Sequence, residues 1–282
     1  MHGTFTTTVQ EFCGARFCYR QSGAGDPVLM LHPSACTGGS WRGLIGELGA
    51  GFSFYTPDLA GYGRSVCEYL HENSSLYAEA EFVAPLLWDA KEPFHVIGHS
   101  FGGAVALALA MAWPERVKTL TLLEPTAFFV LRDRGGEDRE AFNEIAAVAK
   151  ELEYAVAVGE DSRAMSRFVD YWSEPGAWDR LPAAQQAEFS GLAKKVICNF
   201  HALLGEKRDA AEFGRLPFPV TILRGATSPQ PALRVAQVLS ELIPKTRLIT
   251  LAGVGHMGPV THPRAVARAM TGCLRTVRAF AA

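Results

Sequence analysis

The chain has 282 residues, of which 48% are apolar and 20% are charged, and its formal net charge is −2. This composition excludes an intrinsically disordered chain, which needs low hydrophobicity and high net charge. A chain this close to neutral also offers no electrostatic footprint for nucleic acid or for an anionic membrane surface.

The N-terminal residues show no basic stretch followed by an apolar one, so no signal peptide is expected. The longest apolar run, Ala104–Trp113, is about half the length that a membrane-spanning helix needs. Six cysteines are too few for a disulfide scaffold, and no two of them form a Cys-x-x-Cys pair. These features predict reduced thiols in a cytoplasmic protein.

Short β-like runs alternate with amphipathic segments in the first half of the chain, which is typical of a parallel sheet with helices on both faces. Phe5–Phe12 and Ala15–Tyr19 predict an antiparallel opening pair, because only a two-residue link joins them. Further strands are expected at Pro27–His32, Phe52–Tyr55, Phe94–Ile97 and Val117–Leu123. Of the helices between them, the first is expected to be capped by Ser40, and the last is the uniformly apolar stretch Ala104–Trp113.

The alternation then stops, and a strand-like run returns only at Pro219–Leu223. The gap is far longer than the ~12–15 residues at which a structureless loop becomes improbable, and it contains helical stripes and many aromatic residues. We expect residues 125–218 to form a helical cap inserted between the two parts of one core, residues 1–124 and 219–282. A helix, a strand at Thr246–Leu251 and a last helix complete the predicted core.

The pattern G-x-S-x-G occurs at Gly98–Gly102, where a predicted buried strand meets a predicted buried helix. On such a turn the serine is held at strained backbone angles, and small flanking residues avoid clashes. The turn exposes the Ser100 hydroxyl, and the N–H of Phe101 opens the helix, where it can face a developing oxyanion. We predict Ser100 as a nucleophile. The alternative is a glycine-rich helix start that Ser100 merely caps.

Three further segments follow predicted strands: Leu31–Ser34, Asp58–Ser65 and Gly255–Gly258. Together with the Ser100 motif, and in the same order, they resemble segments of the α/β-hydrolase family, and the resemblance covers nearly the whole chain. It implies an α/β fold with a mostly parallel eight-stranded sheet, helices on both faces, and a cap over the active site.

A serine hydroxyl is a poor nucleophile at neutral pH and needs an adjacent base. His256 lies in a glycine-flanked loop after the last predicted strand, at the carboxyl edge of the sheet where Ser100 is also expected. The resemblance gives His256 the place of the family's catalytic histidine. Among the other histidines, His95 lies within a strand and is expected to be a core residue, and His99 is expected to point away from the nucleophile.

The acid that would hold His256 is harder to assign. The resemblance implies an acid in the loop after the seventh strand, but this chain has Ser228 there. Some members of the family place the acid after the sixth strand, where this chain has Glu124. A buried carboxylate needs a partner, and an imidazolium is one, so we predict Glu124 as the acid. In one alternative, Glu124 forms a salt bridge or caps a helix, and Ser228 holds the histidine. In the other, Asp58 is the acid, although its place in a turn favours a structural Asx turn.

The second oxyanion donor is expected from the loop after the third strand. The resemblance implies His-Gly there, whereas this chain has His32-Pro33. Proline has no N–H and cannot donate, so we predict that the next backbone N–H, that of Ser34, acts together with that of Phe101. Cys36 is expected to pack rather than react, because nothing in the sequence lowers its pKa.

These residues predict a serine hydrolase that forms an acyl-enzyme. No cofactor or metal is expected, because the sequence contains no metal-ligand spacing, Walker A motif or dinucleotide fingerprint. The aromatic-rich cap indicates a mainly apolar pocket, and therefore a small or medium hydrophobic ester, lactone or related carbonyl compound as the small-molecule partner. Plain packing between cap and core is the alternative for most of those aromatics.

Three other functions stay open, because a fold does not fix a function. A cofactor-free oxygenase or lyase would use His256 and a carboxylate after the sixth strand to deprotonate its substrate; oxygen uptake without covalent labelling of Ser100 would favour it. A C–C bond hydrolase of a diketone shares the triad and differs in its substrate. A ligand receptor needs no activated serine, so intact Ser100, Glu124 and His256 argue against it.

Overall fold

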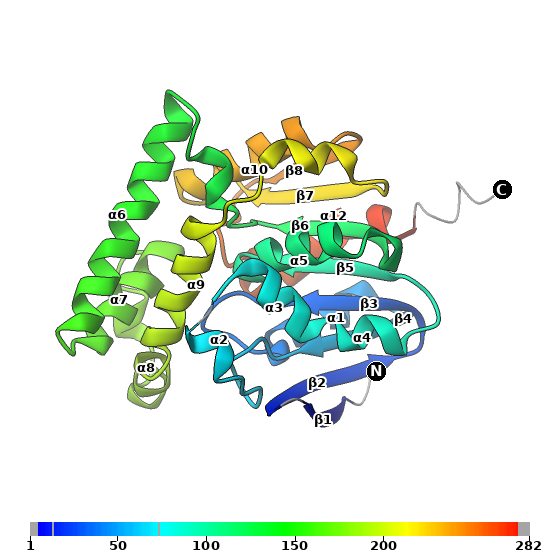
Figure 1. The fold of residues 1–282 in the computed structure, drawn as a ribbon, viewed down its shortest axis with the longest axis horizontal. Coiled ribbons are helices and arrows are strands. Elements are labelled where there is room, and N and C mark those ends of the chain that lie inside the picture. The colour runs from blue at the N-terminus through cyan, green and yellow to red at the C-terminus, as the bar shows by residue number, and fades with distance from the viewer. Residues whose placement is uncertain (1–4, 13, 73, 276–282) are drawn as a thin grey trace.

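The computed structural model describes residues 5–12, 14–72 and 74–275. Its centre is an eight-stranded sheet with the strand order β1-β2-β4-β3-β5-β6-β7-β8 (Figure 1). In chain order the strands are β1 (Thr6–Phe12), β2 (Ala15–Gly23), β3 (Gly25–Leu31), β4 (Gly51–Pro57), β5 (Phe94–His99), β6 (Val117–Leu123), β7 (Val220–Gly225) and β8 (Thr246–Leu251). Strands β3 to β8 are mutually parallel, and β2 pairs antiparallel with both β1 and β4. The fold class predicted from the sequence is confirmed.

Strand β3 ends in the continuous apolar run Val28–Leu31, because both faces of the sheet are covered. Along β3, Val28 and Met30 pack into the core on one face, whereas Leu29 and Leu31 pack into the core on the other. This alternation is the two-residue period of a strand, with apolar partners available on each side. The short apolar run of β3 thus fits a strand that is buried on both faces.

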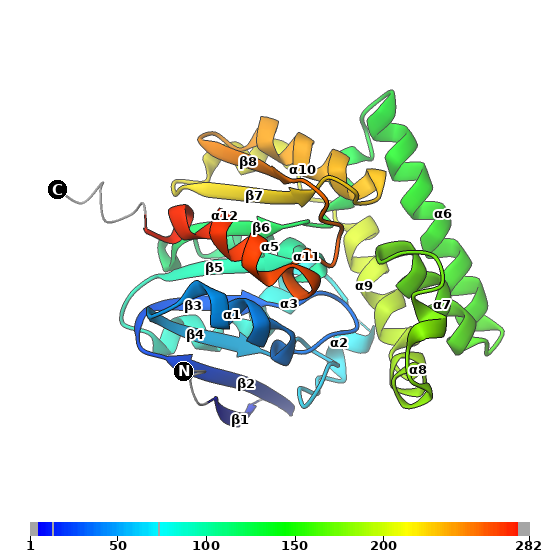
Figure 2. The ribbon, with the colours of Figure 1, turned by 180° about the vertical axis from the view of Figure 1, so that it is seen from behind.

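Helices cover the two faces in separate groups (Figures 1 and 2). One face carries α1 (Arg42–Leu48) and α12 (Pro263–Arg275), which contact each other, and the other carries α3 (Leu76–Val83), α5 (Phe101–Ala112) and α10 (Gln230–Leu242). The short helices of the core are α2 (Tyr69–Glu72), α4 (Pro85–Asp89) and α11 (Gly258–Thr261). Within the described residues, no helix combines the length and the apolar character that crossing a membrane requires.

The start of the first helix differs from the prediction that Ser40 caps it. Thr37 is the capping residue, and its hydroxyl accepts a hydrogen bond from the N–H of Gly39. A 3-10 turn over Gly38–Trp41 follows, and α1 begins only at Arg42. Threonine and serine are both good capping residues, and an inserted 3-10 turn moves the start of the helix without changing its apolar stripe.

Only helices lie between β6 and β7. They are α6 (Glu137–Ala157), α7 (Asp161–Trp172), α8 (Ala183–Ser190) and α9 (Ala193–Gly205), with 3-10 turns at Phe128–Leu131, Trp178–Arg180 and Ala210–Arg215. These helices gather beyond the carboxyl ends of the parallel strands, at the left in Figure 1. We call residues 125–218 the helical segment, and we propose that it is the inserted cap expected from the sequence.

A buried ion pair joins the helical segment to the core. Lys195 Nζ on α9 lies 2.5 Å from Glu79 Oε1 on α3, and their side chains are only 4% and 0% exposed. The ammonium group also lies 5.7 Å from the centre of the Tyr62 ring. Removing one partner of such a pair leaves the other charge buried and uncompensated, which costs more than the pair itself contributes.

We expect Lys195→Met to lower the free energy of unfolding by about 3–5 kcal/mol, because Glu79 is then buried without its cation. The double variant Lys195→Met, Glu79→Leu should recover most of that loss, since neither charge remains. Urea unfolding of the two variants and the parent measures both effects. A single variant as stable as the parent would contradict this account of the pair.

Three core histidines are fully buried and neutral. Burial is the main cause that lowers the pKa of His32 and His95 to about 4 and that of His99 to about 3. Lys118 further lowers the pKa of His95, and His256 further lowers that of His99. In the unfolded chain the same side chains titrate near pH 6.5, so between about pH 6 and 4 the unfolded state binds more protons than the folded one.

The three neutral histidines should therefore contribute their full share to the free energy of unfolding above about pH 7. That contribution should fall as the pH drops towards 4. Three protons taken up on unfolding correspond to a limiting slope of about 4 kcal/mol per pH unit. Urea unfolding measured from pH 7.5 to 5 tests this, with the exposed His201 replaced by glutamine as a control that leaves the slope unchanged. Equal stability at pH 7 and pH 5 would contradict it.

Candidate active site

Ser100 sits between β5 and α5 at φ 54° and ψ −119°, a left-handed conformation that is strained for a residue with a side chain. Two glycines make this turn possible. A Cβ at Gly98 would collide with the carbonyl of Gly102, and a Cβ at Gly102 would collide with the carbonyl of Leu31. The glycines of the G-x-S-x-G pattern thus allow the sharp turn from strand to helix that presents Ser100.

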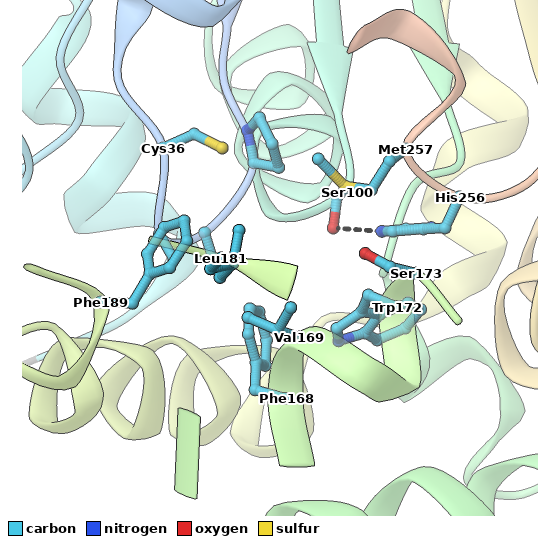
Figure 3. Close-up of a pocket in the computed structure, with 13 residues that line it drawn as sticks. Cys36, Ser100, Phe168, Val169, Trp172, Ser173, Leu181, Phe189, His256 and Met257 are labelled. Atoms are coloured by element: carbon cyan, nitrogen blue, oxygen red, sulfur yellow. Dashed lines mark hydrogen bonds between the residues drawn. The ribbon is translucent and has the colours of Figure 1, made fainter. Parts of the chain in front are cut away.

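His256 lies in the loop after β8 and faces the nucleophile. Its Nε2 is 2.9 Å from Ser100 Oγ, a hydrogen-bond distance (Figure 3). The carbonyl of His256 accepts a hydrogen bond of 2.8 Å from His99 Nε2. His99 therefore faces the loop backbone and leaves the Ser100 hydroxyl to His256.

Glu124 is the carboxylate that reaches His256. It directly follows β6, and its Oε2 lies 3.1 Å from His256 Nδ1. The other oxygen, Oε1, accepts a hydrogen bond from the N–H of Gly225 at the end of β7. The side chain is 4% exposed, so both oxygens of this buried group have partners.

Asp58 and Ser228, the two alternative partners for His256, have other surroundings. Asp58 receives hydrogen bonds from Arg20 at 2.6 Å and from the backbone N–H groups of Gly38 and Arg64, so it holds a turn together. The Ser228 hydroxyl is buried and has no hydrogen-bond partner among the described residues. Of the three candidates, the structure brings only Glu124 to the histidine.

The two predicted oxyanion donors are the backbone N–H groups of Phe101 and Ser34. Phe101 is the first residue of α5, so its N–H has no intrahelical acceptor. Ser34 lines the same cavity as Ser100. The loop that carries it is held by His32, whose Nδ1 donates to the Pro33 carbonyl at 2.8 Å and whose Nε2 accepts from the Leu59 N–H at 2.9 Å. Donation by Phe101 and Ser34 to an oxyanion stays a prediction.

Two residues of the helical segment reach the site without having been singled out in the sequence. The Trp172 ring on α7 packs over the imidazole of His256 at 4.2 Å between ring centres. Asn199 on α9 donates a hydrogen bond of 2.7 Å to Ser34 Oγ. A tryptophan in the aromatic-rich segment suggests plain packing, and a single asparagine gives no signal that it contacts a loop 165 residues away.

A cavity of about 160 Å³ opens onto Ser100 and His256. Its walls are mostly apolar, and Val169, Leu181 and Phe189 of the helical segment point into it opposite the nucleophile (Figure 3). A dry protein cavity of about 150 Å³ accommodates benzene, so the space suits a small apolar group.

Cys36 also lines this cavity. Like Cys18, Cys67 and Cys273 it is a free thiol, and Cys13 lies outside the described residues. Burial raises the pKa of the Cys36 thiol to about 12. The thiolate is the reactive form, so this side chain is a poor nucleophile beside Ser100.

Comparison with known proteins adds to this geometry. A family model described as the alpha/beta hydrolase family matches residues 28–269. The chain belongs to the alpha/beta hydrolase family. It is 28% identical over 257 residues to the pimeloyl-[acyl-carrier protein] methyl ester esterase of Chromobacterium violaceum, covering 90% of this chain and 96% of that protein. It is 34% identical over 115 residues to the 2-hydroxymuconate semialdehyde hydrolase of Pseudomonas sp. strain CF600, covering 39% and 40%.

Solved structures of alpha/beta hydrolases share the fold. A hydrolase from Pseudomonas aeruginosa superimposes with a TM-score of 0.77 at 21% identity, covering 95% of this chain and 98% of that one. A thermophilic esterase from Thermogutta terrifontis gives a TM-score of 0.73 at 20% identity, covering 97% and 99%. At these identities the likeness supports the fold and carries no information on the substrate.

Proposed function

We propose that this alpha/beta hydrolase cleaves small or medium hydrophobic carboxylic esters, lactones or related carbonyl compounds through an acyl-enzyme on Ser100. The observation that carries the proposal is the unbroken relay from Ser100 Oγ through His256 to Glu124, with distances of 2.9 and 3.1 Å. A relay of this geometry activates a hydroxyl for attack on a carbonyl carbon.

In the first half of the reaction, His256 Nε2 takes the proton of Ser100 Oγ while the oxygen attacks the substrate carbonyl. The imidazolium that forms keeps its Nδ1–H directed at Glu124, whose negative charge stabilises it. The N–H groups of Phe101 and Ser34 stabilise the oxyanion, and each such donor typically contributes about 3 kcal/mol to the transition state. His256 then protonates the leaving alcohol.

In the second half, water attacks the acyl carbonyl while His256 takes its proton. The bond between the acyl group and Ser100 Oγ then breaks, the carboxylic acid leaves, and His256 returns the proton to Oγ. The apolar cavity favours a hydrophobic group next to the scissile bond. The relative from Chromobacterium violaceum is named as a methyl ester esterase, which supports an ester as the substrate class. The partner of the site is thus a small molecule or the acyl part of a larger one.

C–C bond hydrolysis is the second candidate, because the relative from Pseudomonas sp. is named as a semialdehyde hydrolase. The same relay would serve it, with a carbon leaving group in place of an alcohol. A cofactor-free oxygenase or lyase would need only His256 and Glu124. That reaction leaves unexplained why Ser100 is held at a strained turn against the histidine.

The test measures turnover of p-nitrophenyl acetate, butyrate and octanoate. Cleavage of an aliphatic diketone and oxygen uptake are measured in separate assays. We expect ester turnover without oxygen uptake, fastest with the shorter acyl groups, which the 160 Å³ cavity can hold. Diketone cleavage with no ester turnover would favour the second candidate. Oxygen uptake with no ester turnover would overturn the proposed serine hydrolase.

A further inference from the structure

A second, much smaller cavity also reaches Ser100. Its volume is about 10 Å³, close to the space that a single water molecule occupies. Ser100, Phe168 and Trp172 line both this cavity and the larger one, so both cavities border the nucleophile. None of the residues that line the small cavity carries a formal charge: they are Ser34, Ser100, Thr126, Phe128, Phe168, Trp172, Asn199, Phe200 and Leu203.

Two residues that line the small cavity each carry a buried side-chain polar atom with no partner within the part of the chain that the structure describes. These atoms are Asn199 Oδ1 and Thr126 Oγ1, on side chains of residues only 1% and 2% exposed. Buried polar atoms are rarely left without a hydrogen bond, because each one costs free energy. Two such atoms at one water-sized cavity indicate that a ligand completes them.

The chemistry of these atoms defines the ligand. The Asn199 amide nitrogen already donates to Ser34 Oγ at 2.7 Å and to Tyr62 Oη at 2.6 Å. Both of its N–H groups are thus used, and Oδ1 is left to accept a hydrogen bond. The Thr126 hydroxyl can donate or accept. An O–H group can donate to Asn199 and accept from Thr126 at the same time, and an anion would find no cation among the lining residues.

We propose that Asn199 and Thr126 form a subsite for one hydroxyl group beside the nucleophile. The hydroxyl belongs to the acyl part of the substrate, next to the scissile carbonyl, or to a single ordered water. This inference rests on the proposed ester hydrolysis and narrows its substrate class to hydroxy-acyl esters in the first case. The larger apolar cavity then takes the hydrophobic remainder of the substrate.

The kinetic test compares methyl lactate with methyl propionate, and methyl 3-hydroxybutyrate with methyl butyrate. For a substrate hydroxyl we expect kcat/KM to be about five- to tenfold higher for one of the hydroxy esters, as one added hydrogen bond predicts. Thr126→Val keeps the side-chain shape and removes only the hydroxyl, so this preference should fall to about one. The Tm should not drop, because the lost hydroxyl has no protein partner.

Thr121→Val is the matched control. Thr121 is a buried threonine of β6 whose hydroxyl also lacks a partner, and it lines neither cavity. Its replacement should leave the preference for the hydroxy ester unchanged. A preference that survives Thr126→Val, or that Thr121→Val removes equally, would show that these atoms do not bind the substrate hydroxyl.

A crystal structure of the unliganded protein at better than about 1.8 Å distinguishes a substrate hydroxyl from an ordered water molecule. This measurement does not depend on enzymatic activity. Ordered water bonded to both Asn199 and Thr126, with no kinetic preference, assigns the subsite to water. An empty cavity in that structure together with equal rates for each ester pair would overturn the subsite. Inactivity towards every ester would instead reject the proposed function, while the crystallographic result still decides the subsite.

Discussion

Replacing Ser100 by alanine is expected to lower kcat for ester hydrolysis about 10⁶-fold and to leave the fold intact. The variant lacks the oxygen that lies 2.9 Å from His256 Nε2 and that we propose attacks the carbonyl. Alanine has the same backbone preferences at φ 54° as serine, so the strained turn is no harder to form. Steady-state kinetics with p-nitrophenyl butyrate and a thermal unfolding curve measure the two effects.

The same variant separates the competing mechanisms. An oxygenase or lyase that works through His256 and Glu124 alone would keep most of its activity after Ser100→Ala. Ester turnover within tenfold of the parent would remove Ser100 from the role of nucleophile. A loss of turnover accompanied by a large drop in Tm would be uninformative by itself, so Ser100→Gly and Ser100→Thr should be measured beside it.

Replacing Glu124 by glutamine is expected to lower kcat about 10³- to 10⁴-fold. The N–H of Gly225 donates to one oxygen of Glu124, so the glutamine carbonyl should take that place and turn its NH₂ towards His256 Nδ1. An NH₂ group cannot accept from Nδ1–H. The imidazole would then carry its proton on Nε2, where it cannot take the proton of Ser100, and the imidazolium would lose its compensating charge.

Ser228→Ala is the control for this experiment. The Ser228 hydroxyl occupies the position at which the family resemblance implied an acid, yet it has no hydrogen-bond partner among the described residues. Its removal should change kcat less than about threefold, because no charge or proton of the relay depends on it. The reverse pattern, with Ser228→Ala severe and Glu124→Gln mild, would mean that the acid is misplaced.

The sequence predicts the parts of this molecule that depend on local chemistry. Strands β3, β5 and β6 can each be recognised as short runs rich in apolar and β-branched residues, because both faces of the sheet are covered. Gly98 and Gly102 mark the turn at Ser100 because no side chain fits there. Parallel strands end at one edge of the sheet, so the loops that carry Ser100, Glu124 and His256 can be expected to meet.

Other features depend on contacts that no local pattern encodes. The contact that favours Glu124 over Ser228 as the acid joins side chains 132 residues apart, and both loops have suitable positions for an acid. Trp172 and Asn199 reach the site only because α7 and α9 dock in one particular orientation. Helix stripes predict which face is buried, but not which residue of the core each side chain meets.

The most direct measurement for the central claim is reaction of the parent protein with a fluorophosphonate, followed by peptide mapping by mass spectrometry. We predict one adduct per chain, on Ser100, formed much more slowly in Glu124→Gln, since the reagent reacts with a hydroxyl only when an adjacent base removes its proton. An adduct on another residue, or no adduct in a correctly folded protein, would contradict the account.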